Sequence, residues 1–238
     1  MTATFELTGY LSGRRYPGRG ILFGTSSDGA YAVASYFIMG RSVNSRNRVF
    51  EKTENGIIAR AYDAALVTDP SLILYTPVRS CGKYWIVTNG DQTDTICSFI
   101  NNGGSFRSAL NTRCYEPDAP HFTPRISGML DMKTGRAEYE ISILKKDPAT
   151  MGCLRNFYEY ADAPAGNGHF IHTYEEGFDP LRTFSGEPVP VLLPEGTIDH
   201  VADALWDSLD QENRISLYVS FLPLHGGIPL TQLRNAHK

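Results

Sequence analysis

The sequence lacks the patterns that mark membrane and secreted proteins. No apolar run approaches the roughly 20 residues that a membrane-spanning helix requires. The N-terminal stretch MTATFELT has no basic residue and no long apolar segment, so we expect no signal peptide. These absences predict a cytoplasmic protein that has no membrane partner.

Closely spaced cysteines and excess positive charge are also missing. The four cysteines form no Cys-x-x-Cys pair, which excludes zinc-finger spacing, and we expect reduced, mostly buried thiols. The formal net charge is −4, which argues against a nucleic-acid partner. His169 and His172 would point to opposite faces of a strand, so we expect no metal site there.

Several common catalytic and nucleotide-binding motifs are absent. The chain has no Gly-x-Gly-x-x-Gly turn, no P-loop and no Gly-x-Ser-x-Gly elbow. Thr2 would become N-terminal after removal of Met1, and an N-terminal threonine can act as a nucleophile. The first strand pattern begins well after Thr2, which argues against this role. An N-terminal-nucleophile amidohydrolase that cleaves a C–N bond is kept as an alternative.

Alternating apolar residues and turn signals predict many strands and few helices. Two hairpins are expected, at 21–39 with its turn at 26–29, and at 126–144 with its turn at 133–135. This order lacks the βαβ alternation of a doubly wound fold, so we predict an α+β protein with antiparallel sheets. Further strands are expected at 57–67, 72–75, 84–88, 154–160, 169–174 and 215–221, helices at 91–100, 105–112 and 198–209, and long surface loops at 161–168 and 177–196.

One polar cluster is rich in arginine. Three arginines and two asparagines fall between Arg41 and Arg48 in a chain that is otherwise slightly acidic. Arginine presents planar donors that match a phosphate or a carboxylate. The cluster therefore suits a small anion such as a nucleoside monophosphate, and a solvated loop between two strands is the alternative.

Three further segments hold polar residues that core packing does not explain. Asn89–Asp94 joins a strand to a helix, where unpaired N–H groups can bind an anion, or where Asp91 simply caps the helix. Glu116 and Asp118 precede Arg125 and could form an acid/base pair beside a cation, or belong to a charged surface loop. Tyr75 ends an apolar run and could donate a hydrogen bond in a site.

Together these segments resemble the stand-alone IMP cyclohydrolase family, whose members close the purine ring in the last step of IMP synthesis. The similarity runs in order from about residue 16 to about residue 221. The matching segments are Tyr16-Pro17-Gly18-Arg19, Gly40-Arg41-Ser42 with Arg46, Tyr75, Asn89-Gly90 with Thr93-Asp94-Thr95-Ile96, Tyr115-Glu116, Thr123-Pro124-Arg125-Ile126 and Phe170-Ile171-His172-Thr173-Tyr174-Glu175.

The resemblance implies a four-layer αββα sandwich similar to N-terminal-nucleophile hydrolases, without use of an N-terminal nucleophile. It implies one domain over 1–238, with 1–15 and 222–238 as peripheral termini. The implied substrate is 5-formamidoimidazole-4-carboxamide ribonucleotide, the products are IMP and water, and neither a metal nor a cofactor is implied. Extra residues at 1–15, 44–56 and 161–196 leave the phosphate site and the formation of a homo-oligomer open.

The chemistry of ring closure then suggests a role for each candidate. Glu116 would transfer protons, while Tyr75 and Arg46 would donate to the developing oxyanion. The substrate-binding candidates are Arg41 and Arg125, with Arg19 as a weaker choice, for the phosphate, Asn89 and Asp94 for the carboxamide or the ribose, and Gly90, Thr93 and Thr123. The remaining alternative is a purine-nucleotide sensor that binds without catalysis.

Overall fold

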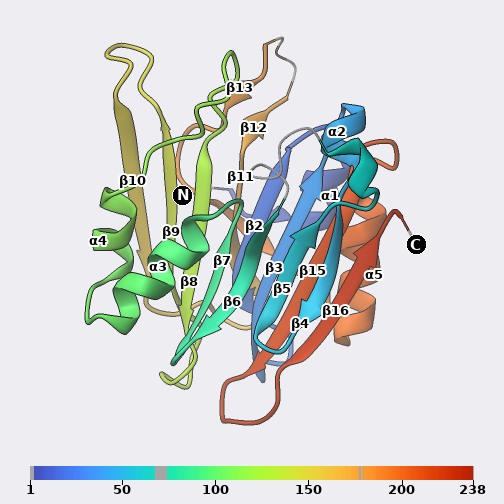
Figure 1. Cartoon of the computed structure of the whole chain (residues 1–238). Coiled ribbons are helices and arrows are strands. Elements are labelled where there is room, and N and C mark those ends of the chain that lie inside the picture. The colour runs from blue at the N-terminus through green and yellow to red at the C-terminus, as the bar shows by residue number, and fades with distance from the viewer. Residues whose placement is uncertain (1–2, 68–73, 177, 179, 238) are drawn as a thin grey trace.

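The computed structural model describes residues 3–67, 74–176, 178 and 180–237 (Figure 1). Within these residues the chain forms a mixed α+β structure with two seven-stranded sheets, a two-stranded sheet and short helices. Thr2 lies outside the described residues. No helix of the described part is both long and apolar enough to cross a membrane.

The first sheet gathers strands from both ends of the chain. Its neighbours pair antiparallel, except for one parallel pair among the described strands, β1 with β14. The order is β1 (Phe5–Glu6), β14 (Val189–Leu192), β11 (Asn167–His172), β2 (Arg19–Thr25), β3 (Tyr31–Met39), β15 (Arg214–Pro223) and β16 (Leu230–Asn235).

The second sheet is an antiparallel meander of strands that follow one another in sequence. Its order is β10 (Cys153–Tyr160), β9 (Glu138–Lys146), β8 (Arg125–Asp131), β7 (Tyr84–Thr88), β6 (Tyr75–Cys81), β5 (Gly56–Arg60) and β4 (Val49–Thr53). A separate pair joins β12 (Tyr174–Glu175) to β13 (Arg182–Thr183).

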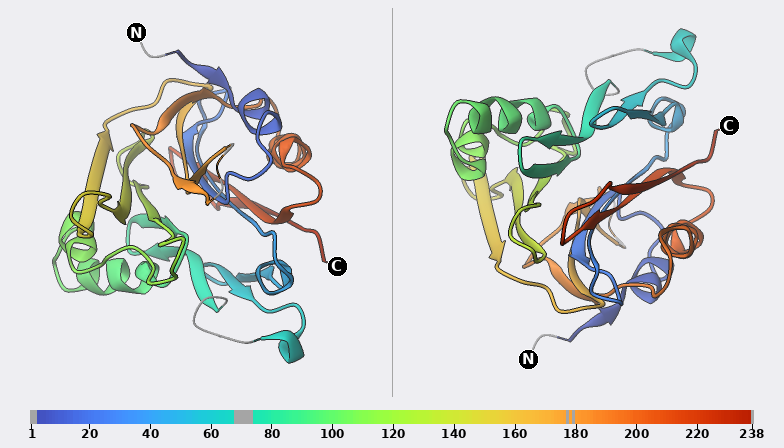
Figure 2. Two further views of the ribbon diagram at one scale, coloured as in Figure 1. Left: turned by 90° about the horizontal axis from the view of Figure 1, so that it is seen from above. Right: turned by 90° about the horizontal axis from the view of Figure 1, so that it is seen from below.

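The two large sheets face one another across the main hydrophobic core, and helices cover their outer faces (Figure 2). In β3, Tyr36 and Ile38 point into this core, while Val33 and Phe37 point to the outer layer. This period of two buries both faces of β3, and each large apolar side chain stabilises the fold by about 1.5–3 kcal/mol. The helices α1 (Leu7–Ser12) and α5 (Ile198–Ser208) cover the first sheet, and α3 (Gln92–Asn101) and α4 (Phe106–Asn111) cover the second.

The structure confirms the strongest local patterns. Both predicted hairpins form, as β2 with β3 and β8 with β9. The helix α5 begins after Thr197, whose side chain accepts a hydrogen bond from the His200 backbone N–H, as expected for an N-cap. His169 and His172 lie on β11 and turn to opposite faces, His169 toward Tyr139 and His172 toward Tyr10.

Other local expectations were wrong. The strand expected at 57–67 ends at Arg60, and a 3-10 helix follows at Ala64–Leu66. Of the strand expected at 72–75, residues 72 and 73 lie outside the described residues, and β6 begins only at Tyr75. The loop expected at 177–196 contains β14, which pairs inside the first sheet. Of the four cysteines, all unpaired, two are buried, while Cys114 is exposed.

Candidate active site

A cavity of about 290 Å³ lies where segments remote in sequence meet, at the end of the sheets marked by β12 and α2 (Val43–Arg46) in Figure 1. Its walls come from the start of β2, the turn after β3, the loop before β8, and β12. Within the described residues it is lined by Tyr16, Arg19, Arg41, Ser42, Asn44, Ser45, Arg48, Glu116, Asp118, His121, Thr123, Tyr174 and Leu181.

Two arginines with buried Nε atoms reach this cavity. Arg48, just before β4, is only 5% exposed, and Arg19, the first residue of β2, is half-buried. The Nε atoms of both have no hydrogen-bond partner among the described residues. Burial, and then the neighbouring charge of Arg19, lowers the pKa of Arg48. Two guanidiniums whose buried Nε donors are unpaired form a site prepared for an anion.

Glu116 supplies a carboxyl group to the same cavity. It is 8% exposed, and its backbone N–H donates to the Thr123 carbonyl at 2.9 Å, which holds the loop in place. Burial raises the pKa of Glu116, and the charges of Arg19 and Arg125 oppose that rise without cancelling it. A carboxyl whose pKa is raised can both accept and return a proton nearer to neutral pH.

Tyr75 lies close to both arginines of the cavity, although it is not among the residues that line it. The residue opens β6 and is 7% exposed. Its hydroxyl is 2.9 Å from that of Tyr36, on β3 of the facing sheet. The structure therefore brings Tyr75 and Glu116 near the same two arginines.

Arg125 lies beside the carboxyl group of Glu116 and does not line the cavity. Its Nη1 donates to Asp91 Oδ1 and to Gln92 Oε1, both at 2.8 Å, and lies 4.0 Å from Glu116 Oε1. Gly90 permits this arrangement, because a Cβ there would lie 2.6 Å from Arg125 Nη1. The sequence offered Asp91 as the cap of α3, but its side chain does not cap the helix. Its carboxylate pairs with Arg113 and Arg125 instead.

The rim of the cavity is aromatic and basic. Tyr16 stacks on Tyr174, with ring centroids 6.1 Å apart, and the exposed Arg41 lies 4.7 Å from the centre of the Tyr16 ring. The hydroxyl of Tyr174 is 2.7 Å from Thr123 Oγ1, and Thr123 also binds the Asp118 carboxylate. Among the substrate-binding candidates, Arg19, Arg41 and Thr123 therefore line the cavity.

Arg46 is not brought to the cavity. It ends the single turn of α2, where its Nε donates to the Gly40 carbonyl at 3.1 Å and its Nη2 to Asn213 Oδ1 at 3.4 Å. Arg48, two residues later, points inward in its place. The sequence predicted an anion site in the whole Arg41–Arg48 cluster. The structure adds the turn of α2, which was not predicted, and of the three arginines Arg41 and Arg48 line the cavity.

Three other candidates act within the protein interior or on its surface. Asn89 donates to the Pro124 carbonyl and accepts from the backbone N–H of Ile126, at 2.8 and 2.9 Å. Thr93 Oγ1 is 2.7 Å from Thr88 Oγ1 and is fully buried. Asp94 is exposed and pairs with Arg79 at 2.9 Å. None of the three lines the cavity.

The contacts of Asn89 lead to a prediction about stability. Asn89→Ala is expected to lower the free energy of unfolding by about 1–3 kcal/mol, because buried partners lose their hydrogen bonds. Urea unfolding measures the effect. Asp94→Asn is the matched control on the same junction, with an expected change of about 0.5 kcal/mol or less, because its partner is solvent-exposed. An Asn89→Ala protein of unchanged stability would contradict this structural role.

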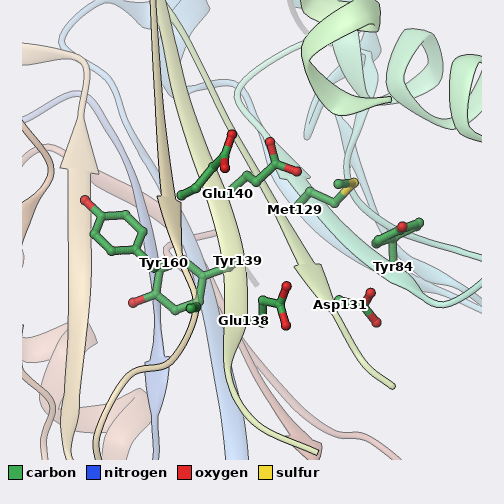
Figure 3. Close-up of a pocket in the computed structure, with 9 residues that line it drawn as sticks. Tyr84, Met129, Asp131, Glu138, Tyr139, Glu140 and Tyr160 are labelled. Carbon is green, nitrogen blue, oxygen red and sulfur yellow. The ribbon is translucent and has the colours of Figure 1, made fainter. Parts of the chain in front are cut away.

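A second cavity, of about 420 Å³, lies on the second sheet, and Figure 3 shows its lining. Asp131, Glu138 and Glu140 contribute carboxylates to it, and of these Asp131 pairs with Lys83. This acidic lining disfavours an anionic ligand. No cluster of potential metal ligands is found among the residues that the structure describes. The arginine-lined cavity is therefore the better candidate active site.

Comparisons with known proteins identify the family of the chain. A family model described as "IMP cyclohydrolase-like protein" matches residues 16–224. A protein of Methanopyrus kandleri named IMP cyclohydrolase is 30% identical over 159 residues, which cover 63% of this chain and 79% of the relative. One of Methanosphaera stadtmanae with the same name is 34% identical over 122 residues, covering 50% of this chain and 59% of the relative. The chain belongs to the IMP cyclohydrolase-like protein family.

Proposed function

We propose that this protein is an IMP cyclohydrolase, which converts 5-formamidoimidazole-4-carboxamide ribonucleotide into IMP and water. Enzymes that catalyse this reaction are classed as hydrolases of cyclic amidines. In purine biosynthesis the reaction runs toward ring closure. The observation that carries the proposal is the meeting of Arg19, Arg48 and Glu116 in one cavity. Buried cations beside a carboxyl of raised pKa suit an oxyanion and a proton transfer.

The reaction joins two groups of the same molecule. The carboxamide nitrogen attacks the formyl carbon, the formyl oxygen gains negative charge, and the resulting hydroxyl leaves as water. Holding the two groups in contact supplies much of the rate. Glu116 takes a proton from the attacking carboxamide nitrogen and gives it to the oxyanion, which becomes a hydroxyl. The hydroxyl then leaves as water with a second proton, which comes from the formamido nitrogen as the ring C=N bond forms, so that no net proton is consumed. Arg48 and Tyr75 donate to the oxyanion, with Arg48 in the place expected for Arg46.

We assign the 5′-phosphate of the substrate to the rim of the cavity. A phosphate dianion beside Glu116 would be repelled by its carboxylate, so the buried arginine pair serves the reacting end. Arg41 is exposed at the rim, near Ser42 and Ser45, and is the candidate for the phosphate. Arg125 is bound to Asp91 and Gln92 and is assigned to hold Glu116.

For the fold, we propose one domain over 1–238 with a four-layer αββα arrangement like that of N-terminal-nucleophile hydrolases. Support comes from the main core, which draws side chains from both large sheets, and from helices on both outer faces. The proposed chemistry uses no N-terminal nucleophile.

The proposal is tested with purified protein and the formamido ribonucleotide, by following IMP formation spectrophotometrically. Turnover within the usual range of about 1–10³ s⁻¹ is expected. Binding of IMP without ring closure would instead identify a nucleotide sensor. Mass spectrometry of the active protein tests the other alternative, because activity of a chain that retains Met1 excludes Thr2 as an N-terminal nucleophile.

Arg125→Ala is expected to move the acid limb of the kcat/KM profile to higher pH. The Arg125 charge lowers the pKa of Glu116, so its removal raises that pKa, and the base form is lost earlier as pH falls. Arg125→Lys keeps the charge and is the matched control, with a smaller displacement. A higher KM with an unchanged pH profile would assign Arg125 to the phosphate instead.

A further inference from the structure

A hydrogen bond between two tyrosines joins the large sheets beneath the arginine pair. Tyr36 lies in the middle of β3, and Tyr75 opens β6 of the opposite sheet, with their hydroxyl oxygens 2.9 Å apart. The ring of Tyr36 is fully buried and stacks on Phe50, with centroids 5.6 Å apart. The position of the Tyr36 hydroxyl is therefore set by the burial of its ring and its packing on Phe50.

Either hydroxyl can donate in this hydrogen bond, and the surroundings favour Tyr36 as the donor. Arg19 and Arg48 lie close enough to the Tyr36 hydroxyl to interact with it electrostatically. Guanidinium groups only donate, so they cannot accept the proton of Tyr36. The Tyr75 oxygen is the acceptor that remains for Tyr36 among the hydrogen-bond partners that the structure describes. When Tyr36 donates, the proton of Tyr75 is free to point elsewhere.

Exposure distinguishes the two tyrosines. Tyr75 keeps an exposed fraction of 7%, while that of Tyr36 is 0%. Of the two residues, Tyr75 is therefore the one that offers some surface to a ligand. A tyrosine that must donate to an oxyanion gains from an orientation that is set before the reaction begins.

We propose that Tyr36 is a positioning residue, which donates its proton to the Tyr75 oxygen and so directs the Tyr75 hydroxyl toward the reacting oxygen of the substrate. The inference rests on the proposed ring closure. Tyr36, on the first sheet, would then orient the hydrogen-bond donor Tyr75, which lies on the second sheet.

The chain offers a closely matched control. Tyr218 lies directly opposite Tyr36 in the β3–β15 register and is 1% exposed. Its hydroxyl is buried and has no hydrogen-bond partner among the described residues. Removal of either hydroxyl deletes one buried oxygen from the same core, but only that of Tyr36 contacts Tyr75.

The test measures kcat and KM of Tyr36→Phe, Tyr75→Phe, the double variant and Tyr218→Phe, with thermal unfolding of each. Tyr36→Phe is expected to lower kcat about tenfold, less than the 10²–10³ typical of a lost direct donor, with KM within about twofold. In the Tyr75→Phe background the same substitution is expected to change kcat by less than about twofold, because the two hydroxyls act as one unit. Tyr218→Phe is expected to match the wild type.

Each other outcome overturns the inference in a recognisable way. A Tyr36→Phe enzyme with wild-type kcat, or one that loses as much activity in the Tyr75→Phe background as alone, rules out positioning through Tyr75. A fall in kcat shared by Tyr218→Phe shows a general effect of core hydroxyls. A wild-type protein without ring closure removes the proposed function itself. The double variant leaves no unpaired hydroxyl in the pair. If Tyr36→Phe alone folds poorly, comparison of the double variant with Tyr75→Phe still measures the effect of the Tyr36 hydroxyl, and a change in kcat above about twofold overturns the inference.

Discussion

Glu116→Gln is expected to lower kcat by at least about tenfold, since positioned acid–base groups usually contribute 10²–10⁴. Glutamine keeps the shape of the side chain but cannot accept the carboxamide proton. Binding of IMP is expected to remain close to that of the wild type, because the arginines and the aromatic rim are unchanged. Steady-state kinetics and calorimetric titration with IMP measure the two effects separately.

The pH dependence of the wild-type activity tests the direction in which the pKa of Glu116 is shifted. Burial raises the pKa of Glu116, so its carboxylate is lost at a higher pH than that of an exposed glutamate as the solution is acidified. The acid limb of kcat/KM is therefore expected above the ordinary glutamate range and is expected to disappear in Glu116→Gln. Asp118→Asn is the comparison variant on the same loop. It keeps the acid limb, moved to lower pH, because the Asp118 charge helps to raise the pKa of Glu116. A Glu116→Gln enzyme with wild-type turnover would remove Glu116 from the mechanism.

Arg48→Met is expected to lower kcat/KM by about 10²–10³, the usual loss for one donor to a developing oxyanion. Methionine fills much of the same space without charge or donors. Because Arg48 is buried with its Nε unpaired, the same change is expected to leave the melting temperature equal or higher. Loss of activity without loss of stability is the signature of a residue kept for function.

Arg46→Met is the matched control within the same cluster. Its guanidinium binds the Gly40 carbonyl and Asn213, so its removal is expected to lower the melting temperature slightly and to change kcat/KM by less than about threefold. Kinetic assays and thermal unfolding of the two variants test the assignment side by side. If Arg46→Met loses the activity and Arg48→Met keeps it, the two roles are reversed.

Some of the site was predictable because its residues stand at turns and strand ends that local patterns reveal. Glu116 and Arg125 flank a proline-rich segment before a clear hairpin, and the structure places them 4.0 Å apart. Arg19 begins the first hairpin, and Arg41 follows it. Of these residues, Arg19 was indicated only by the resemblance to the family.

Other parts of the site were not predictable, because they depend on contacts between distant segments. Asn89 looked like a ligand-binding residue at a helix start, but it holds the segment at 124–126 by two hydrogen bonds. Tyr36 gave no signal at all, because a tyrosine in an apolar strand is typical of a core. Its partner lies 39 residues away in the other sheet.

The pattern of apolar residues, turns and caps was sufficient for the main hairpins, for α5 and for the α+β class. These properties follow from interactions between residues near one another in the chain, which leave a period in the sequence. The choice of Arg48 over Arg46, the pairing of Tyr36 with Tyr75, and the burial that raises the pKa of Glu116 arose only when the two sheets packed together. Desolvation and side-chain direction depend on neighbours that are remote in sequence, so no local period encodes them.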